Sequence, residues 1–142
     1  MASILLSVLP QELSIHRLPA SQPLAKVLQD ALGSPTTATK GSGPELFATL
    51  HSDNELSIVC DAALAVNAEQ SSGPWRAMRV VGQLDFALTG ILAGLAAPLA
   101  EAKISIFAIS SFDTDYLLVK SESLNAAITT LEQAGYQFEH HL

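Results

Sequence analysis

Basic residues and cysteine are both scarce in this chain. Of its 142 residues, 7 are lysine or arginine and 14 are aspartate or glutamate, which gives a net charge of −7. This balance provides no basic patch, so we exclude nucleic acid and a membrane surface as main partners. The single cysteine, Cys60, lies in an apolar run beside Asp61, whose charge opposes formation of a thiolate. We therefore interpret Cys60 as a small buried residue.

Long apolar runs are missing as well. The longest covers residues 86–100, about 15 residues, whereas a membrane-spanning helix needs about 20. Gly90 and Gly94 in this run are spaced as in membrane-helix contacts, but in so short a helix they favour close packing. The apolar start of the chain has no basic residues before it, so we expect no secretory signal. These features predict a soluble, cytoplasmic protein.

The composition is that of a folded protein, since 49% of the residues are hydrophobic and only 15% are charged. Residues 33–44 and 67–74 are rich in Gly, Pro, Ser and Thr and are predicted to be loops. After the second loop, alternating or continuous apolar patterns predict strands over 75–81, 104–110, 116–120 and 136–140. An apolar stretch over 86–102, with Asp85 as its N-cap, predicts a largely buried helix, and a second helix begins after Ser121 or Ser123. The second half therefore reads βαββαβ, a ferredoxin-like arrangement.

The first half repeats part of this pattern. Residues 45–59 align with 105–119 at an offset of 60, with identical residues at Phe47 and Phe107 and at Val59 and Val119. In this alignment Glu55 corresponds to Asp115. We predict two related units, 1–71 and 72–142, with residues 3–8 as an extra strand that completes the first sheet.

Two places combine polar groups that suit a small ligand. In the turn at residues 110–115, Asp115 opens a strand and is a candidate acceptor for a ligand ammonium group. The alternative for this turn is a local Asp turn with solvated acids. Near Gly82, the start of the following helix offers backbone N–H groups to a carboxylate, although the sequence alone favours a plain turn. Ammonium and carboxylate together are the groups of a free amino acid.

Few residues of the chain are arranged as a catalytic or metal site would require. Asp113 and Asp115 are close enough for an acid and base pair, but neighbouring turn carboxylates are usually solvated. His140 and His141 point to opposite faces of a strand, which prevents a joint metal site. No nucleophile, zinc or nucleotide motif is present. We expect no catalytic residue, no metal and no cofactor, and hence a protein that is not an enzyme.

Residues 98–119 contain PLAEA, SIF and SFDTDY in that order, and together with residues 75–92 they resemble the ACT-domain family. The resemblance covers about residues 72–140 and is nearest to small tandem-ACT proteins related to the cytosolic arginine sensors of animals. It implies an α/β fold of two tandem ferredoxin-like ACT units. The sensors have four units and this chain about two, so the resemblance implies a homodimer.

The resemblance also implies a function. ACT units often hold an amino acid where two of them meet, and the complex regulates a protein partner. Asp115 would receive the ligand's α-amino group, and Ser105 with the helix-start loop would hold its carboxylate. The alternative is a structural or protein-interaction module without a ligand. The residues implied as ligand-binding are Asp115, Ser111, Phe112, Ser105, Ile106, Gly82 and Leu84.

Overall fold

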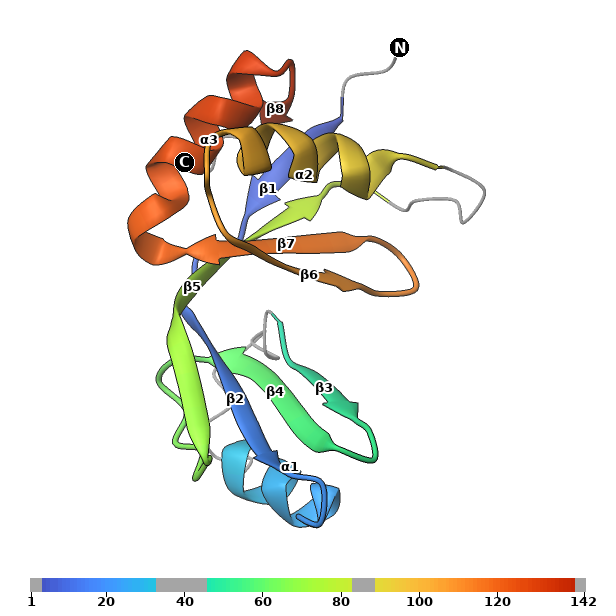
Figure 1. Cartoon of the computed structure of the whole chain (residues 1–142), viewed down its shortest axis with the longest axis vertical. Coiled ribbons are helices and arrows are strands. Elements are labelled where there is room, and N and C mark those ends of the chain that lie inside the picture. Colours follow the sequence, from blue (N-terminus) through green and yellow to red (C-terminus); the bar gives the residue numbers. More distant parts are fainter. Residues whose placement is uncertain (1–3, 33–45, 83–88, 140–142) are drawn as a thin grey trace. The chain divides into compact units, whose positions relative to one another are not determined.

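The computed structural model describes residues 4–32, 46–82 and 89–139. These residues form eight strands, three α-helices and one short 3-10 helix, and the fold is a mixed α/β one (Figure 1). Contacts divide the chain into two compact units. We call Met1–Pro10 with Trp75–Leu142 the C-terminal unit, and Gln11–Pro74 the inserted unit.

The C-terminal unit has the predicted βαββαβ order, with an extra strand from the start of the chain. Its strands lie in the order β6-β7-β5-β1-β8, and α2 and α3 pack against this sheet (Figure 1). The prediction of a ferredoxin-like arrangement in the second half is thus confirmed. Its elements are β1 (Leu5–Val8), β5 (Gln70–Val80), α2 (Ile91–Glu101), β6 (Ile106–Ser110), β7 (Asp115–Lys120), the 3-10 turn Ser121–Ser123, α3 (Leu124–Gln133) and β8 (Gln137–Phe138).

Strand β1 lies between β5 and β8. Leu6 pairs antiparallel with Val80 of β5 and in parallel with Phe138 of β8. The expectation that this strand completes the sheet of the first half is therefore wrong. Leu6 is 1% exposed and belongs to the helix-covered core of the C-terminal unit, which gains this apolar side chain by taking in the strand.

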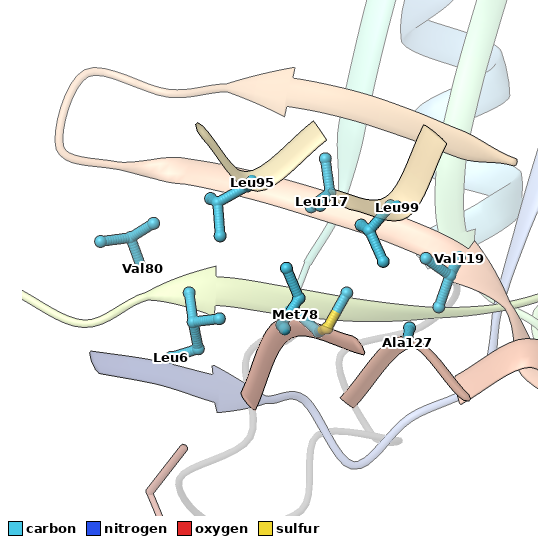
Figure 2. Packing of buried hydrophobic residues seen from close by; sticks show 9 residues of the cluster. Leu6, Met78, Val80, Leu95, Leu99, Leu117, Val119 and Ala127 are labelled. Carbon is cyan, nitrogen blue, oxygen red and sulfur yellow. The ribbon is translucent and has the colours of Figure 1, made fainter. Parts of the chain in front are cut away.

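That core is built from aliphatic side chains of the sheet and of the two helices. Figure 2 shows Met78 and Leu117 of neighbouring strands facing Leu95 and Leu99 of α2. Helix α2 begins later than predicted, at Ile91, and only Leu95 and Leu99 are fully buried on it. Residues 86–88 and the proposed cap Asp85 lie outside the described residues. The helix is therefore less enclosed than its apolar composition indicated.

In its described part, the inserted unit has four strands, which are ordered like β6-β7-β5-β1 of the C-terminal unit, and one helix where that unit has two. Its elements are β2 (Leu13–Pro19), α1 (Leu24–Leu32), β3 (Ala48–His51), β4 (Glu55–Asp61) and the first five residues of β5, and its strands lie in the order β3-β4-β2-β5. Residues 62–69 connect β4 to β5 without a helix, where the C-terminal unit has α3. The loop predicted over 67–74 is wrong for residues 70–74, which form strand. There, Ser71 Oγ lies 2.7 Å from Nδ1 of His16 in β2.

The predicted division into units 1–71 and 72–142 stays a prediction. None of the helices in the described parts of the chain is long and apolar enough to cross a membrane.

Candidate functional site

The turn between β6 and β7 is closed by a serine and a threonine. The backbone N–H of Ser111 donates to the carbonyl of Thr114 over 2.8 Å, and the Ser111 hydroxyl lies 3.1 Å from the same carbonyl. In return, the Thr114 N–H donates to Ser111 Oγ over 3.2 Å. These bonds fix the backbone that carries the next residue, Asp115.

Thr114 ties this turn to the end of β5. Its side chain is buried, and its hydroxyl donates to the carbonyl of Val80 over 2.7 Å. Gly82 follows two residues later in the exposed continuation of β5. The turn and Gly82 therefore lie at the same end of the sheet. The sequence did not predict this role of Thr114, because its neighbours Asp113 and Asp115 are typical of a solvated turn.

Asp115 is half-buried at the first position of β7. The Ser110 hydroxyl donates to its Oδ1 over 2.7 Å. Because side chains alternate along a strand, Asp115 shares a face with Leu117 and Val119, which belong to the helix-covered core. Asp115 forms no ion pair with a basic side chain among the described residues, in contrast to Glu55 and Glu69, which pair with Arg17. Its carboxylate is thus an unneutralised charge at the border of an apolar layer, where a cation is bound more strongly than in open water.

The other predicted residues fall into two groups. Ser111 and Phe112 are exposed in the same turn as Asp115, with Phe112 73% exposed. Ser105 and Ile106 lie at the opposite end of the β6–β7 hairpin, where Ile106 pairs with Val119. At about 3.3 Å per residue, the four steps from Ile106 to Ser110 separate the groups by about 13 Å. Leu84 lies outside the described residues. One small ligand does not reach Ser105 and Asp115 of the same copy.

The start of α2 offers N–H groups for an anion. Its N-cap is Gly90, which has the left-handed φ of 78° that favours glycine, and no side chain caps the helix among the described residues. The expectation placed this helix start near Asp85, whereas it lies at Ile91. In a ferredoxin-like unit the helix after the first strand starts at the end where that strand finishes, which is the end that holds Asp115.

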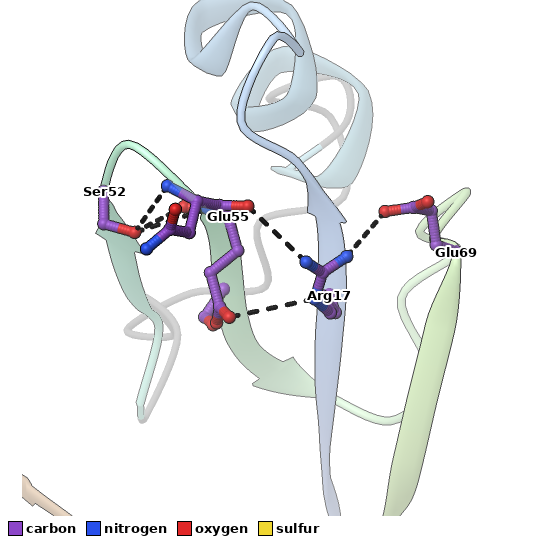
Figure 3. Close-up of polar contacts among 6 residues, drawn as sticks. Arg17, Ser52, Glu55 and Glu69 are labelled. Atoms are coloured by element: carbon purple, nitrogen blue, oxygen red, sulfur yellow. Dashed lines mark hydrogen bonds and ion pairs between the residues drawn. The ribbon is translucent and has the colours of Figure 1, made fainter.

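The corresponding turn of the inserted unit is offset by one residue from our alignment. Figure 3 shows Ser52 bonded to the N–H of Glu55, and the Ser52 N–H donates to the Glu55 carbonyl over 2.9 Å. Ser52 thus corresponds to Ser111 and Glu55 to Thr114. The residue that stands where Asp115 does is Leu56, not Glu55, and the expected equivalence is wrong.

Two further titratable groups are buried in the inserted unit. Cys60 is fully buried, and burial with the nearby Asp61 raises the pKa of its thiol to about 11. The prediction of a buried cysteine is confirmed. Burial lowers the pKa of His16, whose Nε2 has no hydrogen-bond partner among the described residues. Where the structure is described, no three His, Cys, Asp or Glu residues gather to hold a metal ion.

A cavity of about 430 Å³ lies in the inserted unit, between α1 and the connection that replaces the second helix. None of the residues predicted as ligand-binding lines it. The lining residues are Leu18, Gln22, Lys26, Val27, Asp30, Ala65, Val66 and Asn67.

Comparison with known proteins agrees with the fold and matches part of the chain to a family. A model described as ACT domain matches residues 70–133. The mouse protein named cytosolic arginine sensor for mTORC1 subunit 1 is 36% identical over 112 residues, which are 70% of this chain and 34% of that protein. The chain thus spans about a third or less of the length of these curated relatives.

Two solved structures are similar over nearly their whole length. One is a protein from Agrobacterium tumefaciens, with a TM-score of 0.71 and 31% identity over 99% of this chain and 97% of that one. The other is the regulatory subunit of aspartate kinase from Thermus flavus, with a TM-score of 0.61 and 15% identity over 91% and 95% of the two chains. The second likeness concerns the fold alone. Residues 70–133 of this chain thus match the ACT-domain family, and the chain is related to the cytosolic arginine sensors.

Proposed function

We propose that this protein is a cytoplasmic regulatory module that binds a free amino acid and performs no catalysis. The observation that carries the proposal is the carboxylate of Asp115. It is half-buried, oriented by the Ser110 hydroxyl over 2.7 Å, and without a basic partner among the described residues. A ligand ammonium would supply the missing positive charge through a charge-assisted hydrogen bond.

The ligand's carboxylate would bind the uncapped start of α2. The N–H groups of the first helical turn carry a partial positive charge, and they are at the end of the sheet that holds Asp115. Gly82, Ser111 and Phe112 would border the same site. Relatives of this chain named as cytosolic arginine sensors support a regulatory role.

Ser105 and Ile106 would join the site from a second copy of the chain. Their separation of about 13 Å from Asp115 within one hairpin requires this if they contact the same ligand. We therefore propose a homodimer in which the ligand bridges two copies. The ligand would favour one arrangement of the dimer through its differential affinity, and a protein partner would bind that arrangement.

A thermal-shift screen with the twenty amino acids tests this function. At 100 times its dissociation constant, a ligand stabilises the fold by about 2.7 kcal/mol, which raises the melting temperature of a chain of this size by several degrees. Asp115→Asn should abolish the shift. Asp113→Asn, which removes the same charge two residues away, should retain it. If no amino acid shifts the wild-type protein, the amino-acid function is wrong and a protein-interaction module without a ligand becomes the better hypothesis.

A further inference from the structure

The two units share a strand order but differ at the position of Asp115. We infer that only the C-terminal unit holds an ammonium-binding site, so that each chain binds one ligand. This inference rests on the proposed function, and it assigns the inserted unit a supporting role.

The correspondence between the units follows from their hydrogen bonds. Each hairpin turn is closed by a serine whose N–H donates to a carbonyl three residues later, over 2.9 Å from Ser52 and 2.8 Å from Ser111. The same offset continues into the paired strands of each hairpin, where His51 pairs with Leu56 and Ser110 pairs with Asp115. Positions in the two hairpins, β3–β4 and β6–β7, therefore correspond at an offset of 59 residues, one less than the identities in the sequence indicate.

At this offset Leu56 takes the place of Asp115. Leu56 is completely buried and packs in the core of the inserted unit with Leu18, Val27 and Ile58. In the inserted unit, the position that would contact a ligand in the C-terminal unit is thus filled by the aliphatic side chain of Leu56, which packs beneath α1. An ammonium group placed there would lose its hydration without gaining a carboxylate, which is strongly unfavourable.

The acidic residue next to this position, Glu55, does not replace Asp115. Alternation along β4 puts it on the face of the sheet opposite to Leu56. Its carboxylate lies 3.7 Å from Arg17, which also donates to Glu69 over 2.9 Å (Figure 3). The Ser57 hydroxyl donates to Glu55 as well. Glu55 therefore already has a cation and a hydrogen-bond donor from its own chain, and a ligand ammonium would have to compete with both.

Native mass spectrometry of the full chain with a mixture of the twenty amino acids, each at millimolar concentration, counts the sites directly. We expect one added amino-acid mass per chain, and two per dimer. Asp115→Asn should remove the added mass, and so should Asp115→Leu, which copies the inserted unit. Glu55→Gln is the matched control and should bind with a dissociation constant within about twofold of the wild type. Circular dichroism and thermal melting establish that each variant is folded.

The outcomes separate the two proposals. Two added masses per chain, or one that survives in folded Asp115→Asn and disappears in Glu55→Gln, would overturn the single-site inference while leaving amino-acid binding intact. Complete absence of added mass in the wild type would overturn the proposed function itself, and the inference with it.

Discussion

Replacing Gly94 by alanine tests how closely α2 packs against the end of α3. Alanine in a helix interior is usually about 0.5–1 kcal/mol more stable than glycine. Here a Cβ on Gly94 would lie 2.7 Å from the Tyr136 hydroxyl oxygen, whereas ordinary contacts begin at 3.4 Å. Tyr136 must therefore move by about 0.7 Å, and crowding of this kind costs about 1–3 kcal/mol. We expect Gly94→Ala to destabilise the protein by about 1 kcal/mol, or about 3 °C in melting temperature.

The sign of the effect should reverse when the hydroxyl is removed. In a Tyr136→Phe background the oxygen that crowds the new Cβ is gone, so Gly94→Ala should stabilise by about 0.5–1 kcal/mol. Urea unfolding of the four proteins gives the coupling energy as a double-mutant cycle. Ala97→Gly, at an exposed position of α2, calibrates the alanine preference of the same helix. A stabilisation of equal size in both backgrounds would refute the close contact.

Three further predictions concern single groups. Thr114→Val should lower the unfolding free energy by about 1–2 kcal/mol and weaken ligand binding, because the buried Val80 carbonyl loses its hydrogen-bond donor. Thr114→Ser keeps the hydroxyl, so thermal melts with and without ligand should show wild-type stability and binding for this variant. Burial lowers the pKa of His16, so below about pH 6.5 the unfolded chain binds more protons than the folded one, and the unfolding free energy should fall as the pH decreases through that range. Urea unfolding at a series of pH values should show that the unfolding free energy of His16→Gln depends less steeply on pH. With its pKa raised to about 11, Cys60 should react with a maleimide at pH 7 only as fast as the protein unfolds, and faster labelling would contradict its burial.

The fold of the second half could be predicted because its signals are local. Apolar alternation marks the strands, and the helix after Ser123 ends near Gly135, so each element is defined by neighbouring residues. The placement of β1 could not be predicted in the same way. Leu6 alternates equally well in either sheet, and only its partners Val80 and Phe138, far along the chain, determine which sheet it joins. The strand over residues 70–74 was missed for a related reason, since its pairing with β2 outweighs its loop-like composition.

The candidate site was predictable in its residue types and less so in its geometry. Asp115, Ser111 and Gly82 lie at one end of the sheet as a single ligand requires. Ser105 and Ile106 lie at the other end, because β6 runs between them and the turn. The spacing of these residues in the sequence shows this separation only when the register of the β6–β7 hairpin is known. The hydroxyl of Thr114, which connects the turn to β5, became visible only through its bond to Val80.

The comparison of the two units shows why sequence identity was a poor guide to their register. Side chains on a strand alternate between faces, so an alignment that is wrong by one residue exchanges the core for the opposite face. Pairing Val59 with Val119 makes this error. Val119 belongs to the helix-covered core, whereas on β4 it is Leu56 and Ile58 that point toward the helix, so Val59 lies on the opposite face. Matching the alternation of core residues, rather than the identities, gives the offset of 59 that the hairpin bonds require. At that offset the acid of one unit corresponds to a buried leucine in the other, and this difference supports our inference of one place per chain for a ligand's ammonium group.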